Sequence, residues 1–364
     1  MSPLDELATI LRPAGGGLFL VSTGKAEQEA LQQNLYGVSD AAQVQQRFRD
    51  SLSRIATAKG VLLGVPSDVG AGFRRGANLG PQFIRTQLFA DGVDLASQGV
   101  VDIGDVFVVP QLLSDEMLTA AQLEASRLAL YPNVPANERE RLPVAPLSIE
   151  RRAFELVFAL NPKVKPFVLG GDHSTALPVV QALDAVAPKP WGIVQPDAHT
   201  DLLQTRLGIQ HCFATWSWHA NELLGRQGRL TQVGIRASGR DRAHWESTLD
   251  VRQFWAKDVL ADPRGQLDAL LAHVKATGVK GVYFSNDIDG TDAKWADATG
   301  TPEFGGLEPD WLVELIRRLG REVGLLGGDV MEVAPSLTPK PDSVARTVGL
   351  AARYLRETVE AALR

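Results

Sequence analysis

From residue 60 to the end of the chain, short apolar runs alternate with longer stretches in which apolar residues recur at helical spacing. Gly or Asp bounds several of the apolar runs, which is typical of strands buried on both faces of a sheet. We expect strands at residues 61–65, 100–103, 166–169, 192–195, 230–235, 281–285 and 323–327. We expect helices at residues 81–89, 112–131, 148–160, 176–186, 266–276, 309–320 and 342–363. This alternation predicts an α/β fold in which helices cover both faces of a mainly parallel sheet.

Residues 1–59 precede this pattern and are expected to form an N-terminal extension to a main domain at residues 60–364. The clearest element of the extension is a helix expected at residues 39–58. Its one-sided apolar positions are Val44, Phe48, Leu52 and Ile55. We expect this helix to pack on the main domain or on a neighbouring subunit.

Composition excludes some classes of partner. The formal net charge is -6, whereas nucleic-acid binding needs clustered Lys and Arg. The apolar run at residues 17–21 is too short for a membrane span or for a signal peptide, and the residues before it are acidic. Cys212 is the one cysteine, so no intrachain disulfide can form, which suits a reducing cytosol. We therefore expect a cytoplasmic protein that binds neither nucleic acid nor membrane and suits a cationic small molecule.

Three of the expected strands lead into runs of potential metal ligands. These runs are Gly-Gly-Asp-His-Ser at 170–174, Asp-Ala-His-Thr-Asp at 197–201 and Asn-Asp-Ile-Asp-Gly at 286–290. In extended backbone, residues two apart point to the same side, and ligands of parallel sheets bind beyond the carboxyl ends of the strands. The side chains that this spacing brings together are His173, Asp197, His199, Asp201, Asp287 and Asp289.

Four carboxylates in one pocket repel one another, and none of the three runs contains Lys or Arg. Buried charge of that density requires protonation or a bound cation. Two imidazoles with four carboxylates suit Mn, Fe, Co, Ni or Zn better than Mg or Ca alone. Six ligands suit a pair of ions, which can lower the pKa of a shared water until it is a nucleophile at neutral pH. Any one of these residues is more often a turn, a cap or a core residue, but six at matched spacing favour the metal centre.

These motifs resemble those of the arginase/agmatinase (ureohydrolase) family over most of the chain from about residue 60. The resemblance rests on 170–174, 197–201 and 285–292, followed by Ala-Thr-Gly-Thr-Pro at 298–302; weaker matches lie at 64–66, 75–76, 80–81, 233–236 and 329–333. It implies a three-layer α/β/α sandwich, commonly assembled as a homo-oligomer (a trimer or hexamer). It also implies that the six side chains hold two divalent ions per subunit, with Asp197 and Asp287 bridging them.

The resemblance implies a reaction and two catalytic residues. The reaction is hydrolysis of a C–N bond of a guanidino compound to urea plus ammonia or an amine. Glu332 matches the glutamate that pairs with the guanidinium group, whose planar donors suit a carboxylate. His211 stands where agmatinase-like members place a histidine that carries a proton to the leaving amine. His219 and His244 are rival candidates for that proton transfer.

The sequence departs from the agmatinase-like pattern in ways that favour the guanidine-hydrolase branch. Bulky residues follow His211, including Trp216 and Trp218, which either narrow the pocket or pack in the core. Asn286 stands where the family usually has an apolar residue or Phe, and Lys294-Trp295 follows the third motif. This branch resemblance implies free guanidine or a small substituted guanidine as substrate, and nickel in place of manganese.

Three other functions stay open. An agmatinase, guanidinobutyrase or arginase would need partners for the substrate's tail, for which Arg74, Arg75, Lys294 and Asn286 are the candidates. A non-catalytic subunit would keep the fold for assembly with an active partner, but the complete ligand set argues against it. A metal-dependent amide deacetylase on a related fold would normally use one zinc ion and fewer carboxylates.

Overall fold

The computed structural model describes residues 1–338 and 340–364. In these residues nine strands form one sheet with the order β1-β3-β2-β4-β9-β8-β5-β6-β7. All neighbouring strands are parallel except β1 and β3. The strands are β1 (Leu11–Arg12), β2 (Gly60–Gly64), β3 (Val100–Val106), β4 (Lys165–Leu169), β5 (Gly192–Pro196), β6 (Leu230–Ile235), β7 (Arg252–Trp255), β8 (Val282–Asp287) and β9 (Leu325–Met331).

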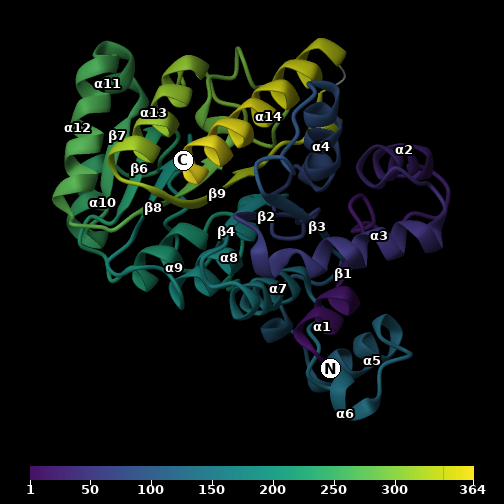
Figure 1. Cartoon of the computed structure of the whole chain (residues 1–364). Helices are drawn as coiled ribbons and strands as arrows, with labels where there is room; N and C mark the ends of the chain where they lie inside the picture. Colours follow the sequence, from purple (N-terminus) through teal and green to yellow (C-terminus); the bar gives the residue numbers. More distant parts are fainter. Residues whose placement is uncertain (339) are drawn as a thin grey trace.

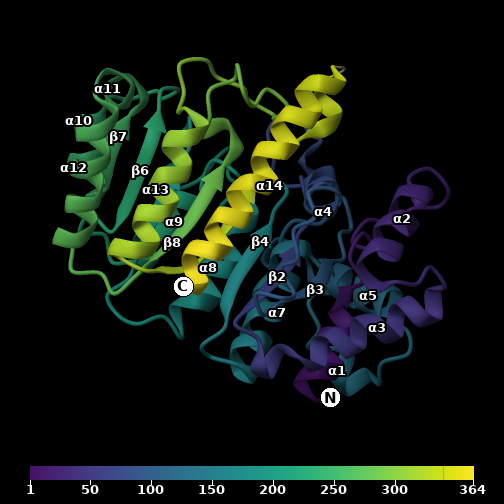
Figure 2. The same cartoon turned by 45° about the horizontal axis from the view of Figure 1, so that its top comes forward.

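Helices cover both faces of the sheet, which confirms the expected α/β/α fold (Figures 1 and 2). One apolar core contains side chains of α1 (Pro3–Ile10), α3 (Ala41–Ser53), α7 (Pro146–Leu160), α8 (Ala176–Asp184) and α9 (Trp216–Leu223). The other contains side chains of α4 (Gly80–Ala90), α11 (Ala256–Ala261), α12 (Pro263–Ala276), α13 (Pro309–Glu322) and α14 (Pro341–Leu363). The remaining α-helices are α2 (Lys25–Tyr36), α5 (Ala120–Leu130), α6 (Ala136–Arg139) and α10 (Arg242–Leu249).

Several elements differ from the sequence-based expectation. We did not expect the strands β1 and β7, or the helices α1, α2, α6, α9, α10 and α11. Both unexpected strands are short edge strands, which carry a weaker pattern than buried ones. The helix expected at 112–131 is α5 alone, because Thr119 forms a capping box with Gln122 and starts the helix there. The strand expected at 323–327 begins two residues later, after Gly324 in a left-handed conformation (φ 97°).

Residues before β2 pack against the rest of the chain. Strand β1 pairs with β3, and helix α1 lies against α7, where Arg152 donates two hydrogen bonds to Glu6 (2.6 and 3.0 Å). Phe48 of α3 is fully buried in the same core. These contacts join the residues before β2 to the main part of the same chain. A separate extension that ends at residue 59 stays a prediction.

The sheet order positions the functional site. Strands β4, β9, β8 and β5 are consecutive and parallel, so their carboxyl ends lie along one edge of the sheet. The three predicted ligand runs follow β4, β5 and β8, and Glu332 follows β9. Segments far apart in the sequence therefore meet at this edge, as ligand-binding segments do in parallel α/β sheets.

Candidate metal centre

The candidate ligands lie where neighbouring strands end. His173 opens the turn η4 (His173–Thr175) after β4, and Asp197 follows β5. Asp287 is the last residue of β8, and Asp289 lies in the next turn, η5 (Ile288–Gly290). The Asp287 side chain fixes this turn, because its Oδ1 accepts the N–H of Asp289 at 2.9 Å. The end of β8 and the turn η5 therefore place the carboxylates of Asp287 and Asp289 at the same edge of the sheet.

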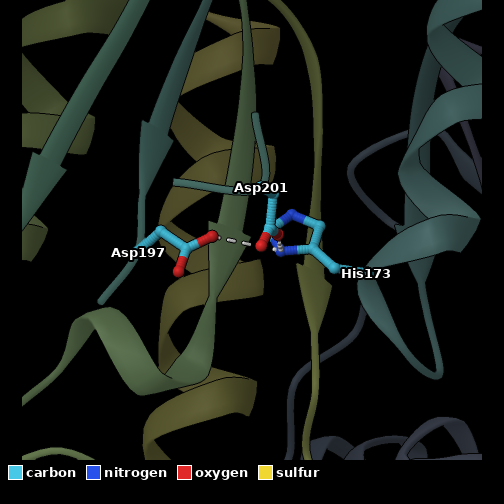
Figure 3. Close-up of side chains that lie close together, drawn as sticks. All are labelled: His173, Asp197 and Asp201. Carbon is cyan, nitrogen blue, oxygen red and sulfur yellow. Dashed lines mark ion pairs between the residues drawn. The ribbon is translucent and has the colours of Figure 1, made fainter. Parts of the chain in front are cut away.

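The structure brings all six predicted side chains together. Two groups have ligand atoms within 4.8 Å of one another. They are His173, Asp197 and Asp201 (Figure 3), and Asp197, His199 and Asp289. Asp287 joins the first group, because its Oδ2 lies 2.9 Å from His173 Nδ1. Asp197 belongs to both groups, so its carboxylate is placed to be shared.

The cluster carries more negative charge than its histidines can balance. In the described part of the chain, these carboxylates form ion pairs with histidines alone. Burial and neighbouring carboxylates raise the pKa of Asp201 and of Asp287 well above the usual range. Burial alone would lower the pKa of His199, but Asp289 and Asp197 outweigh it and raise it to about 12. Buried groups that attract protons this strongly, with imidazole and carboxylate donors, fit divalent cations well.

His173 is held in one orientation by groups around it. Its Nε2 lies 3.1 Å from Ser285 Oγ, which in turn donates to the carboxylate of Asp329 (3.0 and 3.1 Å). This arrangement turns Nδ1 toward the candidate carboxylates, as expected around a metal ligand. Trp216 stacks on the ring at 4.5 Å between centroids, and its indole donates to Asp201 Oδ2 at 3.1 Å. Trp216 therefore packs beneath the site and does not narrow its entrance.

Glu332 lies beside the cluster. Its Oε1 accepts the backbone N–H of His173 at 3.0 Å, and its own N–H donates to the carbonyl of Gly171 at 2.8 Å. Glu332 has a left-handed backbone (φ 62°), which is uncommon for this residue type and often marks a functional position. Burial and the nearby Asp287 raise the pKa of its carboxyl well above the usual range.

The structure gives His211 a different environment. Its Nε2 lies 3.3 Å from Glu116 Oε2, and its ring lies 5.0 Å from that of His219. Within residues 1–338 and 340–364, its Nδ1 is buried and has no hydrogen-bond partner, and the ring forms no ion pair with the six candidate ligands. His219 contacts the carbonyl of Gln210, and His244 lies on the distant helix α10 against Trp245. The role of His211 as proton carrier stays a prediction.

The residues proposed for recognition of the substrate's tail have different placements. Arg74 donates to the carbonyl of Leu337 at 3.4 Å, and Arg75 donates to that of Val69 at 3.4 Å. Lys294 pairs with Glu308. Asn286 is fully buried within the sheet, so it cannot contact a substrate's tail at an entrance.

Sequence reasoning missed several residues that support the cluster. Gln195 donates to Asp197 at 2.7 Å, and Thr301 donates to Asp289 at 3.1 Å. Gln195 could have been found, because it lies near the end of β5, two residues before Asp197, and extended backbone turns residues two apart to the same side. Ser285 carries the same signal, because it stands two residues before Asp287 on β8, whereas Asp329 carries none, because its contact with Ser285 depends on the pairing of β8 with β9. Glu116 reaches His211 from 95 residues away.

Comparison with known proteins agrees with this geometry. A model of the arginase family matches residues 58–360. The chain belongs to the arginase family. It is 31% identical over 307 residues to the guanidinobutyrase of Pseudomonas aeruginosa, covering 81% of this chain and 83% of that protein. It is 32% identical over 290 residues to the mitochondrial agmatinase of Gallus gallus, covering 75% and 73%. The crystal structure of agmatine ureohydrolase from Thermoplasma volcanium superposes with a TM-score of 0.61 at 27% identity, covering 84% and 90%.

Membership of the arginase family confirms the resemblance and the enzyme class predicted from the motifs. The chain is a ureohydrolase, which acts on C–N bonds of amidines. The family uses a pair of divalent ions, and the His and Asp groups described above are suited to bind metal. In the described residues, no helix is both long and apolar enough to cross a membrane.

Proposed function

We propose that this ureohydrolase releases urea from free guanidine or from a small substituted guanidine, with two divalent ions bound per subunit. The observation that carries this proposal is the pair of ligand groups that share Asp197, with the carboxylate of Glu332 fixed beside them. One ion would be held by His173, Asp201 and the two shared carboxylates, Asp197 and Asp287. The other would be held by His199, Asp289 and the same shared pair. When bound, the ions would supply an activated water as nucleophile and positive charge for the transition state.

Glu332 would bind the guanidinium cation. Its Oε1 is already occupied by the N–H of His173, which leaves Oε2 free to accept from the planar donors. Space beside Oε2 depends on Gly300, because a Cβ at that position would lie 3.6 Å from Oε2. Glycine there leaves room for a flat cation against the carboxylate.

His211 and Glu116 would handle the proton of the leaving nitrogen. Glu116 holds Nε2 of the ring and Nδ1 has no hydrogen-bond partner in the described residues, so Nδ1 would be the nitrogen that exchanges a proton. Glu116 would thereby act as a positioning residue for His211. We expect His211→Asn to lower kcat and to remove one limb of its pH profile while metal content stays unchanged. An unchanged profile would assign the proton transfer to another group.

A small substrate is favoured by the segment 67–76, which hydrogen bonds hold to three other parts of the chain. Gly70 donates to Asp172 (3.0 Å), Phe213 donates to the carbonyl of Gly70 (3.1 Å), and Arg74 reaches the turn after Glu332. Arg206 stacks over Phe213 at 4.7 Å. Arginines on these segments would repel the second cation of agmatine. This charge argues against agmatine. The branch resemblance makes free guanidine our first choice, and guanidinobutyrate, whose anionic tail these arginines would attract, is the alternative.

The metal and the assembly are proposed from the donor set and from the branch resemblance. The donor set suits nickel and manganese alike, and the branch resemblance favours nickel. The same resemblance supports a homo-oligomer, a trimer or hexamer. The free, buried Cys212 suits a reducing compartment such as the cytoplasm.

One experiment tests substrate and metal together. The metal-free chain is loaded with Ni or Mn and offered guanidine, methylguanidine, agmatine, 4-guanidinobutyrate and arginine, and urea is measured. We expect the highest kcat/KM for guanidine with Ni. Faster urea release from 4-guanidinobutyrate would reassign the substrate. If no compound yields urea although two ions are bound, the chain is a non-catalytic subunit.

A further inference from the structure

Three glutamines lie side by side on the strands next to the metal cluster. Gln195 of β5, Gln232 of β6 and Gln253 of β7 are direct partners in the parallel register. All three side chains are fully buried. Burial of an amide is unfavourable unless the amide is hydrogen-bonded. The hydrogen-bond partners of these three glutamines therefore indicate their role.

The three amides form one continuous chain of hydrogen bonds. Gln253 Nε2 donates to Gln232 Oε1 at 2.8 Å, and Gln232 Nε2 donates to Gln195 Oε1 at 2.9 Å. Gln195 Nε2 donates to Asp197 Oδ2 at 2.7 Å. At the far end, Trp255 Nε1 donates to Gln253 Oε1 at 2.9 Å. The chain thus runs from the edge strand β7 to a carboxylate of the metal cluster.

The direction of this chain is fixed at both ends. The indole of Trp255 can only donate a hydrogen bond, and an ionised Asp197 can only accept one. Each glutamine must therefore turn its oxygen toward Trp255 and its NH₂ toward Asp197. Hydrogen bonds that point the same way polarise and strengthen one another. The donor end of the aligned amides always faces Asp197.

The chain reaches the ligand segment at two places. Gln195 holds the oxygen of Asp197 that lies 3.3 Å from His173, while the N–H of His199 holds the other oxygen at 2.6 Å. Gln232 also donates to the carbonyl of Thr200 at 2.6 Å, between the candidate ligands His199 and Asp201. Each oxygen of Asp197 therefore accepts a hydrogen bond, and so does the backbone carbonyl of Thr200 in the loop that follows.

We propose that Gln195, Gln232, Gln253 and Trp255 are positioning residues that hold Asp197 in the orientation in which two ions can share it. The inference rests on the proposed function, because it takes Asp197 as a metal ligand. Trp255 contributes although three amides separate it from the cluster. It is one of the two groups that fix the direction of the hydrogen-bond chain, and without it only the hydrogen bond to Gln232 orients the amide of Gln253.

The test measures binding of Mn²⁺ or Ni²⁺ to the metal-free, full-length protein by titration calorimetry, without substrate. We expect Gln195→Leu to weaken binding by about 10- to 100-fold, as other substitutions next to metal ligands do. We expect Trp255→Phe to weaken it in the same direction by about threefold, because it removes the end of the chain. Trp311→Phe is the matched control, because the half-buried indole of Trp311 donates to the carbonyl of Pro263 and takes no part in the glutamine hydrogen bonds. This control variant should bind metal like the parent.

A double substitution separates positioning from general stability. If the hydrogen bonds transmit the effect, Trp255→Phe costs nothing further in the Gln195→Leu background. Equal metal binding by Trp255→Phe and the parent, or full additivity of the two substitutions, would overturn the proposal. If Gln195→Leu fails to fold, Trp255→Phe still tests the proposal, because Trp255 lies on the edge strand β7. If the parent protein does not bind two metal ions, the proposed function itself is refuted.

Discussion

Two buried clusters of charge lie in the same sheet and are built in opposite ways. In one, Arg85 of α4 is fully buried between Asp102 and Asp105 of β3. It donates to both oxygens of Asp102 (2.8 and 3.1 Å), to Asp105 (2.5 Å) and to the carbonyl of Gly104 (2.9 Å). In the other, Asp197, Asp201, Asp287 and Asp289 meet two histidines and form no ion pair with Lys or Arg in the described residues.

The difference separates a structural cluster from a functional one. Arg85 supplies the positive charge and donors that its carboxylates need, and Asp105 in turn accepts the N–H of Gly15 at 2.7 Å. That cluster is complete within the chain and fastens the N-terminal segment to the sheet. The candidate metal centre has no Lys or Arg partner in the described residues, and the raised pKa values of Asp201 and Asp287 mean that these carboxylates attract protons in the absence of a cation. Several buried carboxylates that gather with histidines and have no Lys or Arg partner indicate a ligand from outside the chain.

The largest effect is expected from Asp287→Asn, which keeps the size of the side chain and removes its charge. We expect turnover below about one hundredth of the parent rate and loss of metal, because a shared ligand is gone. The metal-free variant should unfold at the same temperature as the parent or higher, because repulsion falls. Metal analysis, urea release and thermal unfolding check these outcomes. Retention of both ions and of the rate would refute the bridging role of Asp287.

The second prediction applies to the other cluster. Arg85→Met removes the cation and leaves the buried carboxylate of Asp105 and the partly exposed carboxylate of Asp102 without it. We expect the free energy of unfolding to fall by about 3–5 kcal/mol, measured by urea denaturation. Burial already raises the pKa of Asp105 although Arg85 lies beside it, so removal of Arg85 further disfavours the ionised carboxylate. Metal binding by the folded fraction should be unchanged. Weaker metal binding at full stability would mean that the clusters are not separate.

The third prediction concerns pH. Asp201 and Asp287 have a raised pKa because burial and neighbouring carboxylates disfavour their ionised forms. The pKa of His199 is about 12, because Asp289 and Asp197 outweigh the effect of burial. The folded, metal-free chain therefore binds more protons than the unfolded chain, and its stability should fall as pH rises from about 5 to about 8.

Bound metal should reverse this trend, because the ligands must lose their protons to bind it. Thermal unfolding with and without Mn²⁺ across this pH range measures both slopes. We expect the stabilisation by metal to grow as pH rises. A metal-free protein that becomes more stable toward pH 8 would contradict the excess of negative charge assigned to the cluster.

The smallest effect is expected at an exposed ion pair. Arg151 and Glu155 lie 3.2 Å apart on the surface of α7, where water screens both charges. Arg151→Ala should change the free energy of unfolding by less than about 0.5 kcal/mol. It is the control for Arg85→Met, since both remove one arginine from an ion pair. An equal loss in the two variants would show that burial does not set the strength of the Arg85 cluster.

The sequence predicted which side chains lie together at the candidate metal centre because their signal is local. Each candidate ligand follows an apolar strand, and the spacing of two residues between Asp197, His199 and Asp201 is visible without a structure. Parallel strands then bring those ends to one edge of the sheet. Glu332 was found through the family resemblance, and the structure sets it beside His173.

The sequence could not predict contacts that depend on pairing distant segments. The pairing of Arg85 with Asp102 and Asp105 requires α4 to pack against the edge of the sheet. The glutamine chain requires the register of β7, a short edge strand that the apolar pattern did not reveal. Likewise, the contact of His211 with Glu116 depends on where an irregular segment folds back.

The most direct test of the central claim is a crystal structure of the chain loaded with Ni or Mn, with anomalous scattering to locate the ions. We expect two peaks per chain, one next to His173 and one next to His199, with Asp197 between them. A single peak, ions bound elsewhere, or an empty cluster after loading would contradict the assignment of these carboxylates to a two-metal ureohydrolase site.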